Sequence, residues 1–316
     1  MREMTAALGF LILSGVITFF LYPILINFLY RFQLKEPINP DVPQTHFIKQ
    51  GTPTAAGLLP IAVFLLLNGL FNRAESISVL LLVTGTLGVL GFFEDFFKIY
   101  HRSRLRKTVR EAIIPFVTLS DLSWNLYKLI LFPWNAFKEI FRALGSQHVG
   151  GISPYQKILV QTAVAVFLVL WLTINLGTSL WLPFLGEIEL GLLYLPLGVG
   201  GFLFLVNSIS ITDGLDGLVG GLLAIGFTAL LALAIFLGRG ELAIAAGILV
   251  GGLLPFLYFN AHPARVFAGN VGALSWAGAF VALAFLLQRE VLLLVIGGVF
   301  LLEGLSVVLQ VASVKL

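Results

Sequence analysis

The sequence contains no cysteine and few charged residues. The absence of cysteine excludes a disulfide framework and a thiolate metal site. Only 11% of the 316 residues are charged, whereas a soluble domain carries roughly 25%, and the mean hydropathy is +1.01. Such a composition excludes a water-soluble globular protein and indicates an integral membrane protein.

What the sequence has instead is long uncharged stretches. Eight contain no charged residue and a ninth is interrupted only by Glu303. They cover residues 4–30, 50–72, 77–93, 158–186, 190–212, 217–238, 242–261, 266–288 and 291–314. Each is about as long as a helix that crosses a hydrocarbon core, whereas barrel strands would alternate over ~10 residues. We therefore predict an all-α, polytopic transmembrane helical bundle of about nine spans, forming a single membrane domain over residues 1–316. The first stretch is too long for a signal peptide and lacks a small-residue cleavage site, so we expect a retained span.

The basic residues predict the orientation of this bundle. Fifteen of the nineteen fall in alternate loops, including ten between Lys98 and Lys157. The positive-inside rule then places the N-terminus outside and the C-terminus in the cytoplasm. The polar clusters at 33–54, 94–107, 207–217 and 260–272 all fall on the cytoplasmic side, so we expect a substrate that arrives from there.

Adjacent carboxylates, Glu94 and Asp95, lie at the cytoplasmic end of the third span. Two neighbouring carboxylates at a membrane edge repel each other unless they share a cation or a proton. The pair fits a metal or phosphate site. It fits equally well a helix end in which Lys98 neutralises the charge.

A second acidic motif joins the fifth and sixth spans. Asp213 and Asp216 are three residues apart and would share one face of a helix. Gly214 and Gly217 allow the backbone to approach a ligand, and a helix N-terminus there suits phosphate oxygens. The alternative is an ordinary Asp-Gly turn between helices, which the second carboxylate makes the weaker interpretation.

Two further loops give weaker signals. Residues 46–54 form a basic, hydroxyl-bearing segment that suits a phosphate or a solvated linker, and residues 260–272 suit a ligand loop or a juxtamembrane turn. A lone His46 or His262 is more often a structural hydrogen-bonding residue than a ligand. Carboxylates, a basic loop and helix N-termini on one membrane face together indicate metal-assisted chemistry on a phosphate.

Five segments, in order, resemble the phospho-N-acetylmuramoyl-pentapeptide transferases, members of the polyprenyl-phosphate N-acetylhexosamine-1-phosphate transferase superfamily. They are residues 49–54, 94–98, 212–217, 260–267 and 303–310. The resemblance implies an enzyme that transfers phospho-MurNAc-pentapeptide from UDP-MurNAc-pentapeptide to undecaprenyl phosphate, giving lipid I and UMP in peptidoglycan synthesis, with Mg²⁺. It implies a place in the lipid bilayer of the bacterial cytoplasmic (inner) membrane with a cytoplasmic active face, a homodimer as the usual assembly, and no nucleic-acid partner.

The resemblance also implies roles for single residues. The catalytic group would be Asp95, Glu94, Asp213, Asp216 and Lys98. Substrate contacts would come from Lys49, Thr54, Asn207, Gly214, Leu215, Phe267, Gln310 and Lys157. Metal ligands would be Asp213 and Asp216, with Asn270 at a degraded ligand position.

The chain departs from the family pattern at the site. Glu94 and Asn270 stand where the family has Asp, and Ser210 stands where it has Asn. The sequence ends at Leu316, before the family's triple-histidine loop and tenth span. These differences leave a second interpretation, a catalytically impaired or engineered member that keeps the fold and the lipid and nucleotide groove without turnover. A transporter is a third, although its motifs would lie at mid-membrane depth.

One segment is longer than in the family. Residues 109–145 place Trp134, Phe137 and Phe141 on one face of a helix, with charged residues elsewhere. We expect an amphipathic helix in the plane of the membrane interface, with surface packing as the alternative.

Overall fold

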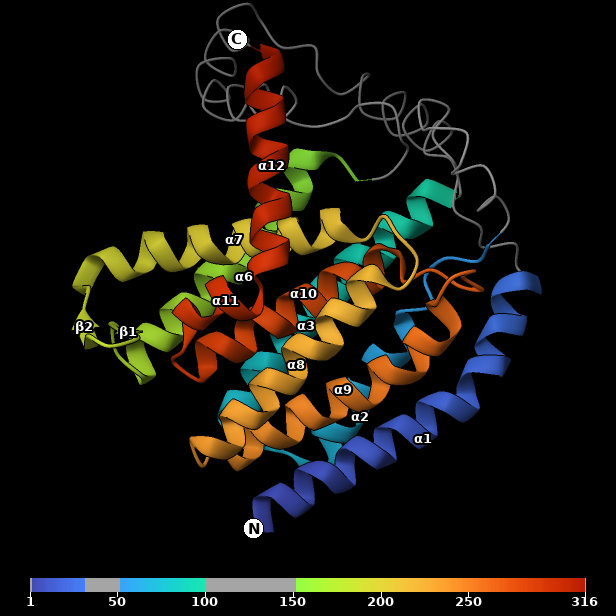
Figure 1. Ribbon diagram of the computed structural model, residues 1–316, viewed down its shortest axis with the longest axis horizontal. Coiled ribbons are helices and arrows are strands. Elements are labelled where there is room, and N and C mark those ends of the chain that lie inside the picture. Colours follow the sequence, from blue (N-terminus) through green and yellow to red (C-terminus); the bar gives the residue numbers. More distant parts are fainter. Residues whose placement is uncertain (1, 32–51, 100–151, 316) are drawn as a thin grey trace, which may run out of the picture.

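The computed structural model describes residues 2–31, 52–99 and 152–315, which form a bundle of helices (Figure 1). Seven of the helices in the described part are long and apolar enough to cross a membrane. They are α1 (Arg2–Arg31), α3 (Glu75–Ile99), α6 (Pro154–Asn175), α7 (Tyr194–Thr212), α8 (Leu218–Phe236), α9 (Gly240–Asn260) and α10 (Gly269–Leu286). The predicted class, a polytopic helical bundle, is confirmed.

Two predicted spans take other forms. The stretch 50–72 yields only α2 (Leu58–Phe71), because residues before it form an extended segment whose backbone bonds to the 267–268 region. The stretch 291–314 is bent by 84° at Gly297, between Glu290–Ile296 and Gly298–Ser313. It contains η4 (Glu290–Leu292), α11 (Leu293–Ile296) and α12 (Gly298–Lys315). The described residues thus provide seven spans, or eight if the bent pair is one, and nine remains a prediction.

The stretch 158–186 is helical only in its first part, whereas the sequence predicted a helix throughout. Helix α6 ends at Asn175, and a hairpin of β1 (Ser179–Leu182) and β2 (Gly186–Glu189) follows, leading through η3 (Gly191–Leu193) into α7. Gly177, before β1, and Gly186, the first residue of β2, have φ values of +94° and +78°, which favour glycine and permit the chain to turn at these two positions.

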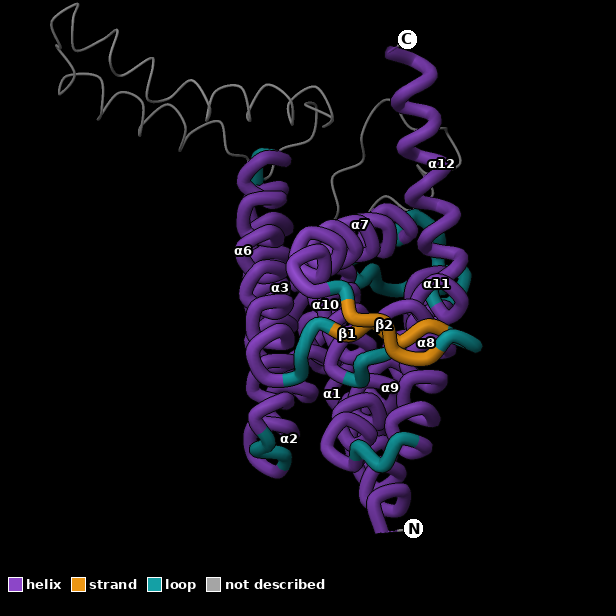
Figure 2. Tube along the Cα trace, turned by 90° about the vertical axis from the view of Figure 1, so that its left-hand side faces the viewer, coloured by secondary structure: helices purple, strands orange, loops and turns teal. Residues whose placement is uncertain are grey.

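Helices α9 and α10 form the centre of the bundle. Of their membrane-length windows, 78% and 89% are buried, compared with 17% for α1. The two central helices contact each other through Phe256 and Trp276, whose rings lie 4.8 Å apart. Helix α1 lies along α9 and α10 lies against α3, with α6 beside α3 (Figures 1 and 2). Helix α1 is therefore peripheral, which leaves most of its length facing the surroundings.

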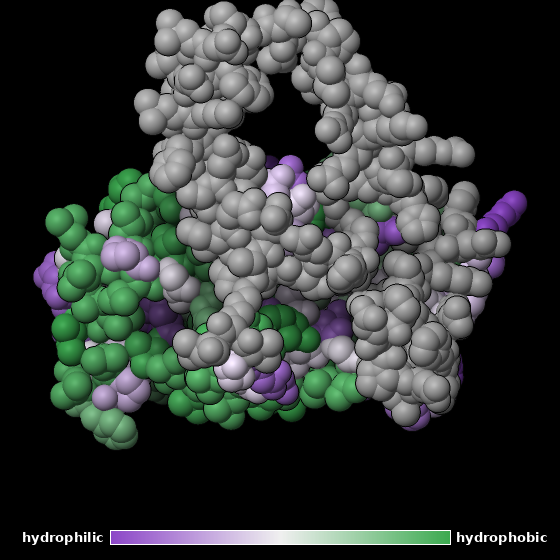
Figure 3. Space-filling view, turned by 90° about the horizontal axis from the view of Figure 1, so that it is seen from above, coloured by the Kyte–Doolittle hydropathy of each residue, from purple (hydrophilic) through white to green (hydrophobic). Residues whose placement is uncertain are grey.

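The described surface is rich in apolar side chains. Phe20, Ile24, Leu66 and Ile225 are each more than half exposed, and hydrophobic residues cover most of the described part of the face in Figure 3. Such a surface suits lipid rather than water, so the chain is a multi-pass membrane protein. The predicted interfacial helix at 109–145, including Trp134, lies outside the described residues, as does Lys49.

Candidate functional site

Asp95 is the best-anchored residue of the predicted site. It lies near the end of α3, is 5% exposed, and accepts three hydrogen bonds from the first turn of α10. Its Oδ1 accepts from the backbone N of Asn270 at 3.0 Å and from Asn270 Nδ2 at 2.8 Å, and its Oδ2 accepts from Val271 N at 3.1 Å. A carboxylate suits this place because the first backbone N–H groups of a helix have no partner within the helix. Asp95 thus caps α10 from a different helix.

Glycines permit this close approach of three segments. Gly269 has a φ of +70°, and a Cβ there would lie 2.6 Å from Asp95 Oδ2 and 2.7 Å from Ala55 N. A Cβ on Gly91 would overlap the backbone of Asn270. The backbone of the extended segment completes the junction: Phe267 N donates to Pro53 O, and Ala56 N donates to Phe267 O. The junction therefore places Thr54, which is 4% exposed, and Phe267 beside the end of α3.

Glu94 is held by two lysines. Its Oε2 lies 3.1 Å from Lys157 Nζ at the start of α6, and its Oε1 lies 3.7 Å from Lys98 Nζ one turn along α3. All three side chains are mostly buried, with 11% of Glu94, 17% of Lys157 and 21% of Lys98 exposed. The lysine partner that the sequence offered as an alternative is therefore present, and a second cation accompanies it. This lysine pair, Lys98 and Lys157, concentrates positive charge next to Asp95.

The second acidic motif forms a turn. The sequence predicted a shared helical face for Asp213 and Asp216, but α7 ends at Thr212 and α8 begins at Leu218. Gly217, with a φ of +76°, precedes the first residue of α8 and cannot continue a right-handed helix. The turn brings Asp216 to the loop after α9, where its Oδ2 accepts from Ala264 N at 3.2 Å and lies 3.1 Å from His262 Nδ1.

Asn260 joins these two loops, a role that the sequence did not single out. Its Oδ1 accepts from Gly217 N at 2.9 Å and its Nδ2 donates to Val266 O at 2.8 Å. His262 was expected to be a structural hydrogen-bonding residue. Its Nδ1 contacts the carboxylate of Asp216, and 85% of its side chain is exposed. Asn260 and His262 both lie in the motif at 260–267. The sequence could not predict their partners, because Gly217 is 43 positions from Asn260 and Asp216 is 46 positions from His262.

Other predicted site residues lie in less constrained places. Asn207 Nδ2 donates to Gln161 Oε1 at 2.9 Å, which links α7 to α6. Gln310 is exposed on α12 and donates to Ser306 Oγ at 3.2 Å. Gly214 lies in the turn with Asp213, and Leu215 is 59% exposed there. Their substrate roles remain predictions.

The sequence predicts two carboxylates of this turn, Asp213 and Asp216, as metal ligands, and that role remains a prediction. No group of three or more His, Asp or Glu side chains that could hold a metal occurs among the residues that the structure describes. Asn270 faces Asp95, and its Nδ2 is engaged there. Mg²⁺ commonly binds one or two carboxylates together with substrate phosphates, so Asp213 and Asp216 fit that ion when a substrate completes its shell.

The contacts of Glu94, Asp95, Asp216 and Asn260 bring together the ends of five helices at one end of the bundle, namely α3, α6, α8, α9 and α10. Comparison with known proteins defines the class: the family model described as Glycosyl transferase family 4 matches residues 148–288, from just before α6 to just after α10. A membrane-embedded transferase is the class that the helices, the clustered charges and this match define.

Curated relatives define the family more closely. A phospho-N-acetylmuramoyl-pentapeptide-transferase of Halalkalibacterium halodurans is 36% identical over 313 residues, covering 96% of this chain and 82% of the relative. The protein of the same name from Anoxybacillus flavithermus is 34% identical, covering 96% of this chain and 82% of the relative. The one from Bacillus subtilis is 35% identical, covering 97% of this chain and 83% of the relative. The chain belongs to the phospho-N-acetylmuramoyl-pentapeptide-transferase family.

Proposed function

We propose that this protein transfers phospho-MurNAc-pentapeptide from UDP to undecaprenyl phosphate, forming lipid I and releasing UMP. In this reaction an oxygen of the lipid phosphate attacks the sugar-linked phosphorus of the nucleotide, and the bond from that phosphorus to the UMP oxygen breaks. The single observation that carries the proposal is 36% identity over 96% of the chain to a transferase of that name.

The lysine pair supports this chemistry. Two anionic phosphates must come together, and their mutual repulsion falls where fixed cations are already partly desolvated. Lys98 and Lys157 lie on two different helices around Glu94, which keeps their ammonium groups close together without a bound phosphate. We propose that these ammonium groups contact the phosphates of the substrates, and that Lys49 and Thr54 assist them.

Mg²⁺ is the cofactor that fits the acidic turn. When bound, it would neutralise the charge that develops on the departing phosphate. We propose that Asp213 and Asp216 hold it together with the nucleotide phosphates. Asn270, as an amide, offers only a neutral oxygen, and its Nδ2 donates to Asp95. Asp95 then acts as a positioning residue for α10, and Gly214, Leu215 and Phe267 adjoin the uracil.

The site would face the cytoplasm, where the nucleotide substrate is made. Fifteen of the nineteen basic residues fall in loops on the side that carries the site, which supports that orientation in the bacterial inner membrane. A homodimer remains part of the proposal.

Turnover by the purified protein tests the reaction. In detergent micelles with UDP-MurNAc-pentapeptide, undecaprenyl phosphate and Mg²⁺, UMP and lipid I should appear in equal amounts, and EDTA should stop both. Omission of undecaprenyl phosphate is the control for hydrolysis of the nucleotide. A folded protein that binds the nucleotide but releases no UMP would contradict the proposal and favour the non-catalytic interpretation.

A further inference from the structure

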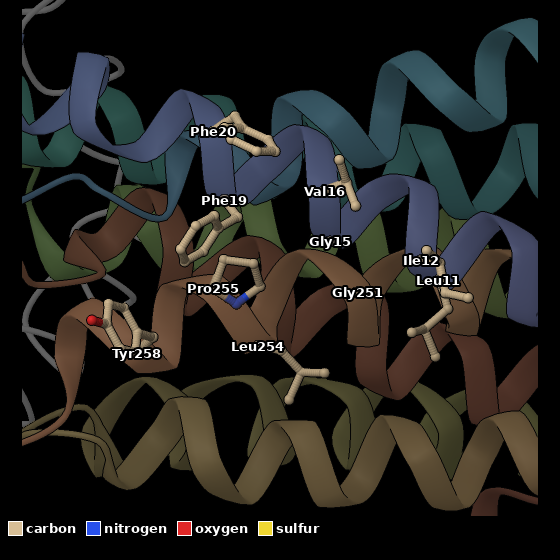
Figure 4. A pocket seen from close by; sticks show the side chains of 10 residues that line it. All are labelled: Leu11, Ile12, Gly15, Val16, Phe19, Phe20, Gly251, Leu254, Pro255 and Tyr258. Atoms are coloured by element: carbon tan, nitrogen blue, oxygen red, sulfur yellow. The ribbon is translucent and has the colours of Figure 1, made fainter.

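A groove runs along the outside of the bundle between α1 and α9, separate from the candidate site (Figure 4). Gly15 and Gly251 form its floor, where the two helices come so close that a Cβ on Gly15 would lie 3.3 Å from the carbonyl oxygen of Gly251. Side chains from both helices form its walls, and its volume is about 410 Å³, within the range of ligand pockets.

The groove has the length and the surroundings of a site for hydrocarbon. Its walls include Val16, Phe20 and Leu254, which are 48%, 71% and 49% exposed on helices that are long and apolar enough to span a membrane. From Leu11 to Phe20 a helix rises about 13 Å, which is close to half of a ~30 Å hydrocarbon core. The groove therefore matches one leaflet of a bilayer and lies where lipid chains surround the protein.

One end of the groove carries a positive charge. Tyr258 lines that end, and the guanidinium of Arg265 lies 5.7 Å from the centre of its ring. The same guanidinium lies 5.9 Å from the ring of Phe259, so two aromatic rings hold it near the end of the groove. Arg265 is exposed, and none of the ion pairs among the described residues involves it. Its charge is therefore available to an anion.

We infer that this groove binds an anionic phospholipid, with an acyl chain between α1 and α9 and the headgroup phosphate on Arg265. The apolar walls accommodate an acyl chain, and the exposed guanidinium of Arg265 near one end favours a negative headgroup and fixes the direction of the lipid. The groove walls on α1 and α9 share neither the lysine pair nor the acidic turn, whereas Arg265 lies in the loop after α9, next to Ala264, whose N donates to Asp216.

Two variants test the two halves of the lipid site. Val16→Trp fills the groove with a bulky ring, and Arg265→Gln removes the charge and keeps a polar side chain of similar length. Val89→Trp, at a 56% exposed position on α3, is the control for added bulk. Arg239→Gln, at the other end of α9, is the control for lost charge.

The measurement is native mass spectrometry of the purified full chain in detergent, titrated with phosphatidylglycerol or with zwitterionic phosphatidylcholine. We expect one high-affinity phosphatidylglycerol, weakened about fivefold by Arg265→Gln and lost in Val16→Trp, with both controls like the parent. Equal affinity for the two lipids, or affinities that neither variant changes, would overturn the lipid site. So would a change of oligomeric state in Val16→Trp with unchanged lipid affinity, because the groove would then be an interface between two copies.

Discussion

Asn270 holds Asp95 through its side chain as well as its backbone, with Nδ2 2.8 Å and N 3.0 Å from the same carboxylate oxygen. A neutral amide at position 270 gives Asp95 a donor where a carboxylate would give it a second negative charge. The arrangement joins α3 to α10 by direct hydrogen bonds. The identity of residue 270 therefore decides whether this junction needs a cation.

Asn270→Asp should make the stability of the protein depend on a divalent cation. The substitution replaces a donor by a carboxylate next to buried Asp95, which should lower the free energy of unfolding by about 1–3 kcal/mol. Mg²⁺ between the two carboxylates should restore most of that loss. The measurement is the melting temperature in detergent with EDTA and with MgCl₂.

The control for Asn270→Asp is Asn72→Asp, the same chemical change at the opposite end of the bundle. Asn72 Nδ2 donates to Asn68 Oδ1 and to Glu241 O, so the variant should lose stability without recovery in Mg²⁺. Equal responses of the two variants to Mg²⁺ would show that residue 270 does not face a carboxylate.

Gly269→Ala should lower the free energy of unfolding by more than the cost of placing alanine at a positive φ. Gly238 has a similar φ of +67°, but a Cβ added there would meet nothing within 4 Å, so Gly238→Ala measures the backbone cost of about 1–2 kcal/mol. At Gly269 the new Cβ also collides with Asp95 and Ala55. We expect at least about twice the loss of unfolding free energy for Gly269→Ala. Similar losses, measured as melting temperatures, would mean that the three segments are not closely packed.

The orientation can be tested with single cysteines, since the chain has none. Arg73 is exposed after α2, and His262 is exposed in the loop after α9, at the end that carries the site. In intact cells, a membrane-impermeant maleimide should label Arg73→Cys only, and it should label both variants after lysis. Labelling of His262→Cys in intact cells would reverse the predicted orientation.

The sequence predicted the parts of this structure that depend on local composition. Uncharged length predicted the helices, and the Glu94–Lys98 ion pair was one of the two alternatives that the sequence left open for the adjacent carboxylates. It could not predict Lys157 as the nearer partner of Glu94, because the contact joins residues 63 positions apart. The cap of α10 by Asp95 spans 175 positions for the same reason.

The composition of the sequence also could not predict where the helices are interrupted. The stretch 158–186 contains no charged residue, yet a hairpin occupies 179–189. The positive φ values of Gly177 and Gly186 permit the turns before β1 and at the start of β2. The extended segment before α2 forms because its backbone groups bond to Phe267 and Ala268. Partners of this kind become visible only when the fold brings distant loops together.

The most direct test of the central claim, that the lysine pair serves substrate phosphates, is a double-mutant cycle of Glu94→Gln and Lys157→Gln. The measured quantity is kcat/KM for UMP release, with the melting temperature of each variant as the check on folding. If Lys157 contacts a phosphate, Lys157→Gln should lower kcat/KM by about tenfold or more, and the double variant should stay as low, because removal of Glu94 supplies no cation. If Lys157 only neutralises Glu94, the double variant should recover near-parental activity, and that recovery would contradict the proposed site.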